Sequence, residues 1–140
     1  MRRSLVTLAI VLASATATAE LLKVTDLYNK SEVLLKESSA VKTEAERITK
    51  LKDFEKAIEN TRETYEKNES DQDSDAYEAI SRLYYTLEPI VKLVGEKKIA
   101  AKCELTENQV RSADAQGKKE GAPLSKDASV AIEWLKVFCK

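Results

Sequence analysis

Apolar residues return every three or four positions along most of this chain, the spacing that places them on one face of a helix. The clearest stripe runs from Val41 to Tyr65, and an earlier one runs from Leu21 to Leu35 and is interrupted near Ser38 and Ser39. The longer stripe resembles a heptad repeat for about three heptads and then drifts, so it favours packing in a bundle over a coiled coil.

A polar, acidic segment from Asn68 to Ser74 separates these helices from the next one. We expect Asp75 to cap that helix, because Glu78 follows at the spacing of a capping box. Pro89 interrupts the apolar stripe and predicts a kink or a new start, since proline lacks the N–H donor. Gly95 is the expected stop.

The segment Leu105–Val110 predicts another helix start, in which Thr106 caps, Gln109 reaches back and Leu105 packs on Val110. We expect that helix to end before a loop at 117–123 and a last helix to begin near Ser125. No strand-like alternation or hairpin turn appears after residue 19. The predicted fold class is all-α: a small antiparallel bundle of four to five helices.

The start of the chain has the three parts of a secretory signal peptide. Basic Arg2 and Arg3 precede an apolar stretch from Leu5 to Ala13, and small residues follow up to Ala19. The apolar stretch is too short to span a bilayer, which takes about 20 residues. We therefore predict a signal peptide over 1–19, cleavage before Glu20, a single domain over 20–140, and no membrane anchor after processing.

The two cysteines, Cys103 and Cys139, are expected at the open end of a C-terminal helical hairpin. Export would supply an oxidising compartment, so we predict a structural disulfide that closes this hairpin. A redox pair is the alternative, but the sequence lacks the Cys-x-x-Cys spacing that tunes a reactive thiolate.

Composition limits the chemistry available to the protein. The chain contains no histidine, which removes the commonest general base and metal ligand. Acidic and basic residues alternate as on a solvated helix surface, so neither nucleic-acid binding nor paired catalytic carboxylates are indicated. We predict no catalytic residue, no cofactor and no metal ligand.

Asp71, Asp73 and Asp75 alternate like the opening of a calcium-binding EF-hand loop. Ala76 stands where that loop needs glycine, and Arg82 stands where it needs a bidentate glutamate. An acidic linker that leads into a helix N-terminus explains the pattern better.

The run Leu105-Thr106-x-x-Gln109 resembles the Leu-Thr-x-x-Gln motif of a family of small periplasmic helical chaperones. The resemblance covers five residues of a motif that the family usually carries twice. It implies binding of unfolded clients on a concave helical surface.

Four aromatic residues are candidates for contact with a partner: Tyr77, Tyr84, Tyr85 and Trp134. Tyr77 and Tyr84 share a helix face with Ile80 and are expected in the core, whereas Tyr85 points about 100° away. Tyr85 is therefore the candidate partner contact.

These patterns lead to an expected function class. We expect an exported, noncatalytic helical bundle, periplasmic or extracellular, that acts through protein contacts with a partner the sequence does not identify. Two other hypotheses are a carrier of a small apolar ligand between the helices and a chaperone-like binding protein. A histidine-free hydrolase that acts through carboxylates is the enzymatic hypothesis.

Overall fold

A computed structural model of the chain describes residues 24–68, 74–96 and 99–139. Within these ranges the protein forms five α-helices and no strand. They are α2 (Val24–Ala40), α3 (Glu44–Glu66), α4 (Asp75–Val94), α5 (Ile99–Ala115) and α6 (Lys126–Phe138). The all-α prediction is confirmed for this part of the chain, whereas the predicted signal peptide, 1–19, and its cleavage site lie outside it.

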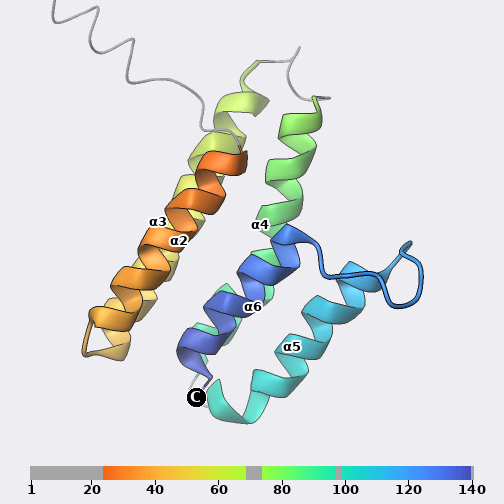
Figure 1. The fold of residues 1–140 in the computed structure, drawn as a ribbon. Coiled ribbons are helices and arrows are strands. Elements are labelled where there is room, and N and C mark those ends of the chain that lie inside the picture. The colour runs from red at the N-terminus through yellow and green to blue at the C-terminus, as the bar shows by residue number, and fades with distance from the viewer. Residues whose placement is uncertain (1–23, 69–73, 97–98, 140) are drawn as a thin grey trace, which may run out of the picture.

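Each helix runs antiparallel to the one before it, so that α6 runs back alongside α5 and α4 (Figure 1). α2 and α3 pair along their lengths, α4 packs on α3, and α5 packs on α4. α6 contacts α4, α5 and α2, which draws the N-terminal and C-terminal helices together. The connection between α5 and α6 projects from the body of the bundle (Figure 1).

The core is made of the apolar stripes seen in the sequence. Its largest fully buried side chains are Trp134, Phe54, Leu27, Leu51, Ile58, Ile80, Leu83, Leu87, Ile90 and Val110. Phe54 of α3 stacks on Trp134 of α6, with ring centroids 5.8 Å apart, and the indole N–H of Trp134 donates to Ser31 Oγ at 2.9 Å. This contact joins α2, α3 and α6 around one aromatic pair.

The first helix does not break at the two serines, so that prediction was wrong. Ser38 donates its hydroxyl to Leu34 O at 2.8 Å, and Ser39 donates to Lys36 O at 2.7 Å. Because each hydroxyl is satisfied inside the helix, the pair does not compete with the backbone ladder. α2 therefore continues to Ala40.

The predicted cap of α4 was displaced by one residue. Ser74, not Asp75, is the N-cap, and its hydroxyl accepts from the backbone N–H of Tyr77 at 3.1 Å. Asp75 instead lies in the first turn, where a carboxylate interacts favourably with the helix dipole. The helix also runs through Pro89 without a new start and ends at Gly95 as expected.

The fourth described helix, α5, begins at Ile99, eight residues before the start that a cap at Thr106 predicted. Thr106 is inside it and donates to Lys102 O at 2.9 Å, so it does not cap. Leu105 is 63% exposed and does not form the predicted hydrophobic staple. Residues 99–102 contain no helix stop, which let the helix start before the apparent capping signal.

A capping box does exist elsewhere, at the start of α3. Thr43 accepts from the N–H of Glu46 at 3.2 Å, and the Glu46 carboxylate accepts from Thr43 N–H at 3.1 Å. The Thr-x-x-Glu spacing is present in the sequence. The helix was nevertheless predicted to begin at Val41, because the apolar stripe begins there.

Candidate functional site

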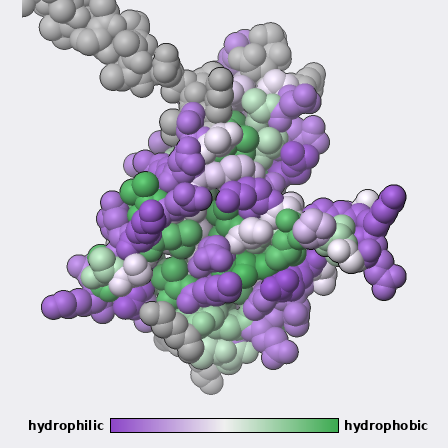
Figure 2. Space-filling view, in the orientation of Figure 1, coloured by the Kyte–Doolittle hydropathy of each residue, from purple (hydrophilic) through white to green (hydrophobic). Residues whose placement is uncertain are grey.

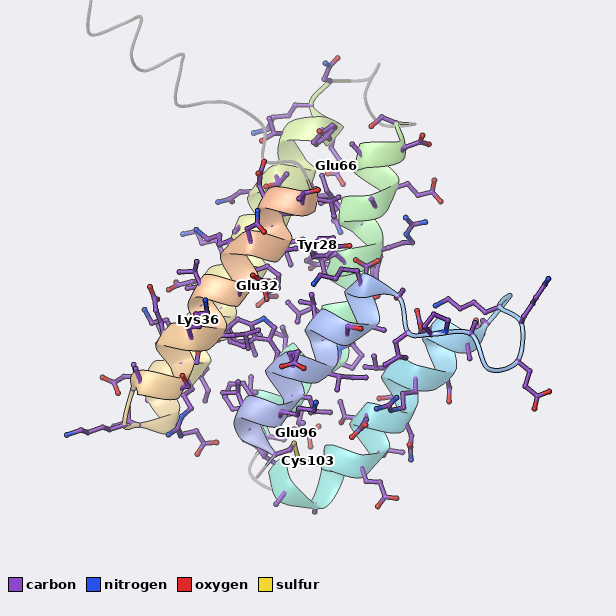
Figure 3. All side chains as sticks on the ribbon, in the orientation of Figure 1. Tyr28, Glu32, Lys36, Glu66, Glu96 and Cys103 are labelled. Carbon is purple, nitrogen blue, oxygen red and sulfur yellow. A yellow bond between two sulfur atoms is a disulfide. The ribbon has the colours of Figure 1, made fainter. Side chains whose placement is uncertain are left out.

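The C-terminal hairpin is closed by the predicted disulfide. Cys103 is bonded to Cys139 across a sequence separation of 36 residues, with Cα atoms 5.9 Å apart. Cys103 lies in the second turn of α5, because that helix begins at Ile99, and Cys139 is the C-cap of α6. Figure 3 shows Cys103 at the end of the bundle where α5 begins and α6 ends.

A groove of about 930 Å³ lies at the other end of this hairpin, and we call it the main groove. It is open to solvent and forms where α4, the C-terminal part of α5 and the first turn of α6 meet, with Tyr28 of α2 at one end. It is lined by Tyr28, Glu78, Ser81, Arg82, Tyr85, Thr86, Pro89, Gln109, Val110, Ala113, Asp114, Gln116, Lys118, Ser125, Lys126 and Asp127.

A hydrogen bond between α2 and α6 defines one end of the main groove. The Tyr28 hydroxyl donates to Asp127 Oδ1 at 2.5 Å. Burial, followed by the hydrogen bond and the negative charge of Asp127, raises the pKa of Tyr28 far above its ordinary value. The hydroxyl therefore stays protonated and keeps donating to the carboxylate. Figure 3 shows Tyr28 beside the N-terminal end of α6.

A second buried carboxylate fixes the connection between α5 and α6. Asp114 accepts from Ser125 N–H at 3.1 Å and from Lys118 Nζ at 2.8 Å. Burial works to raise the pKa of Asp114, but the hydrogen bonds from Lys118 and Ser125 together outweigh it and lower that pKa. The carboxylate is thus held ionised as a structural acceptor at the base of α6.

A smaller depression of about 310 Å³ adjoins the main groove between α4 and α5, and we call it the side groove. Tyr85, Pro89 and Gln109 line both grooves. The side groove also contains Leu105 and Thr106, which belong to the Leu-Thr-x-x-Gln run. The two grooves therefore share one strip of surface on α4 and α5.

Tyr85 stands at the junction of the two grooves and is 60% exposed. Its ring meets the Tyr84 ring edge-on, with centroids 5.4 Å apart. The guanidinium of Arg62, from α3, lies 4.4 Å from the Tyr84 centroid and 5.7 Å from the Tyr85 centroid. These cation–π and edge-on contacts hold the exposed Tyr85 ring on the side that faces the bundle.

The tyrosine stack is anchored further by an ion pair on α3. Arg62 Nε lies 3.2 Å from Glu66 Oε1, and the same oxygen accepts from the Tyr77 hydroxyl at 2.9 Å. Figure 3 shows Glu66 at the interface of α3 and α4. Arg62 is thus held on both sides, by a carboxylate and by two aromatic rings.

Most of the visible surface around these helices is hydrophilic, and hydrophobic side chains gather along the lines between helices (Figure 2). Among the described residues, the large hydrophobic side chains that remain exposed are Val33, Tyr85 and Leu105. Two of these three line the grooves between α4 and α5, whereas Val33 lies on α2. Two of the three exposed large hydrophobic side chains thus lie on the side of the bundle formed by α4 and α5.

The structure places the predicted site residues in two separate regions. The two cysteines meet at the disulfide-bonded end of the hairpin, opposite its loop, and line neither groove. Tyr85 lies in both grooves. Sequence reasoning did not identify Tyr28, Asp127, Arg82 or Lys126 as groove residues. No local signal could have found them, because the groove forms only when α2, α4, α5 and α6 pack together.

Across residues 24–68, 74–96 and 99–139, no group of three acidic or cysteine side chains is arranged to hold a metal ion. In this part of the chain, no helix combines the length and the apolar character needed to cross a bilayer. Comparison with protein-family models, with curated proteins and with solved structures finds no match for this chain.

Proposed function

We propose that this protein is an exported, noncatalytic bundle that binds a segment of another protein along the strip shared by the two grooves. The observation that carries the proposal is the position of Tyr85, which is 60% exposed at the junction of the grooves. Tyrosine is enriched at protein interfaces because its ring offers a large contact area and its hydroxyl offers a hydrogen bond.

The support behind Tyr85 fits this role. A side chain that is already held in place loses little conformational entropy when a partner covers it. Arg62 and Tyr84 pack against the Tyr85 ring from within the bundle, so much of the cost of ordering the ring is met before binding.

Export is supported by two independent features. The N-terminal pattern of residues 1–19 is that of a signal peptide. The disulfide between Cys103 and Cys139 is compatible with an oxidising compartment, where such bonds persist. The proposed location is therefore periplasmic or extracellular.

The grooves fit a small apolar ligand less well. A carrier site is expected to be enclosed and lined mainly by residues such as leucine and isoleucine. The main groove is open, and six of its lining side chains are charged: Glu78, Arg82, Asp114, Lys118, Lys126 and Asp127. A polypeptide, which carries both polar and apolar groups, matches this lining better.

Chaperone-like binding of unfolded chains is a second candidate, favoured by one observation. Leu105, Thr106 and Gln109 line the side groove beside Tyr85. Leu105 is 63% exposed, so it offers an apolar contact to an extended client.

The buried carboxylates of the main groove support the noncatalytic part of the proposal. Asp114 and Asp127 each accept hydrogen bonds that fix the first turn of α6. Catalytic carboxylates would need to present their oxygens to a substrate, whereas one oxygen of each of these two carboxylates is engaged inside the fold.

Two measurements test the proposal. The intact mass of exported protein should correspond to a chain that begins at Glu20 and lacks two hydrogens; a retained leader or two free thiols would contradict export.

Native purification with quantitative mass spectrometry should recover a partner protein that is lost with Tyr85→Ala and retained with Val33→Ala. Val33 is the matched control because it is also exposed, at 55%, but lies on α2. Equal recovery with both variants would contradict Tyr85 as the contact.

A further inference from the structure

The charged side chains of the main groove differ sharply in exposure. The basic side chains of Arg82 and Lys126 are 63% and 56% exposed. The acidic groups Asp114 and Asp127 are almost buried, at 11% for the Asp114 side chain and 9% for Asp127. Glu78 is the one exposed acid in the lining, at 70%. Two of the three most exposed charged side chains in the lining are therefore basic.

One carboxylate oxygen of each of these two acids is engaged within the fold. Asp127 accepts from the Tyr28 hydroxyl, and Asp114 accepts from Lys118 Nζ and Ser125 N–H. Their carboxylates hold α6 against α2 and α5, and neither forms an ion pair with Arg82 or Lys126.

The ion pairs of the two exposed cations are loose. Arg82 Nη1 lies 3.9 Å from Glu78 Oε1, and Lys126 Nζ lies 4.0 Å from Glu32 Oε1. Exposed ion pairs at such distances contribute roughly 0–1 kcal/mol. An incoming carboxylate can therefore replace either partner at little cost.

One face of α4 carries both a positive charge, at Arg82, and an apolar surface, at Tyr85 and Pro89. Arg82, Tyr85 and Pro89 lie three and then four positions apart, which places them along one face of the helix. All three line the main groove, and Lys126 lies in the first turn of α6 in the same lining. The first turn of a helix also carries a positive partial charge.

We propose that the main groove binds an acidic peptide segment, with carboxylates of the segment paired to Arg82 and Lys126 and an apolar side chain packed on Tyr85 and Pro89. This inference rests on the proposed function, and it adds the chemistry of the partner. The match is one of charge, because the segment supplies carboxylates for two exposed cations whose own acidic partners are loosely held.

A random dodecapeptide library displayed on phage and panned on the purified exported protein tests this directly. Enriched peptides should combine Asp or Glu with an aliphatic or aromatic residue. Fluorescence anisotropy with the best synthetic peptide should show weaker binding as sodium chloride is added. Arg82→Gln with Lys126→Gln should lower the affinity by roughly threefold to tenfold, in line with the loss of two exposed ion pairs.

The controls separate this inference from the proposed function. Lys36→Gln with Lys56→Gln removes two exposed basic residues from α2 and α3 and should leave the affinity unchanged. Enriched peptides that need Tyr85 but carry no acidic residues would overturn the acidic partner and leave the proposed function standing. If no peptide depends on Tyr85, the proposed function fails as well.

An anionic membrane is the alternative partner for the two exposed cations. Vesicles of equal parts phosphatidylcholine and phosphatidylglycerol should bind far more weakly than the peptide. Binding to them that depends on Arg82 and Lys126 but not on Tyr85 would overturn the peptide assignment in favour of an anionic membrane.

Discussion

At the scale of single residues, a few buried polar groups join segments that are distant in sequence. Ser31 of α2 is fully buried and accepts from the Trp134 indole N–H, a contact that spans 103 positions in the sequence. The apolar stripes predicted many of the large buried side chains, whereas Tyr77 and Tyr84, also expected in the core, are only partly buried. No local pattern marks Ser31 as the acceptor for Trp134. Such a pair becomes visible only when α2 and α6 are brought together.

Ser31→Ala should lower the free energy of unfolding by about 1–3 kcal/mol, because the buried indole N–H would lose its acceptor. The matched control is Ser39→Ala, also in α2, whose exposed hydroxyl bonds only to Lys36 O. Urea denaturation followed by circular dichroism measures both variants. Equal stability of the two would contradict the structural role of the indole hydrogen bond.

At the scale of elements, helix existence was easier to predict than helix ends. The stripe that ends at Tyr65 and the stop at Gly95 are confirmed. The misplaced start of α5 has a physical cause, because Thr106 and Gln109 match a capping box while the preceding residues can equally propagate a helix. Local signals do not settle which of two compatible starts the tertiary packing selects.

α5 is the element that depends most on the disulfide. Only two of its 17 residues, Thr106 and Val110, are buried, so its apolar packing is limited and Cys103 supplies a covalent tether. Cys103→Ser should lower the melting temperature, because a bridge closing a loop of this length contributes about 4 kcal/mol in the chain-entropy model. Amide hydrogen exchange should accelerate more in α5 than in α3. Uniform acceleration, or an unchanged melting temperature, would argue against this dependence.

At the scale of the whole molecule, the grooves arise from the way four helices converge, so composition and periodicity could not predict them. The sequence did single out Tyr85 as pointing away from the core face. It could not show that this ring would stand beside Arg82, Pro89 and the first turn of α6. That arrangement depends on the antiparallel return of the chain, which the disulfide and Asp114 both help to fix.

Stability should fall in acid partly through Asp114. Since folding lowers its pKa, its contribution is fully present above the ordinary aspartate value of about 3.9 and is lost as the pH falls through the lowered value. Asp114→Asn should therefore be less stable near neutral pH and lose less stability between pH ~5 and ~2. Asp53→Asn, at an exposed position of α3, is the control. Parallel curves of unfolding free energy against pH for wild type and Asp114→Asn would contradict this role.

The most direct test of the account is photo-crosslinking in cells that export the protein, with benzoylphenylalanine placed at Tyr85 or, for comparison, at Val33. We predict a discrete crosslinked adduct in the exported fraction from position 85 and none from position 33. An adduct of equal yield from both positions, or none from position 85, would contradict the claim that the strip around Tyr85 is where this bundle meets its partner.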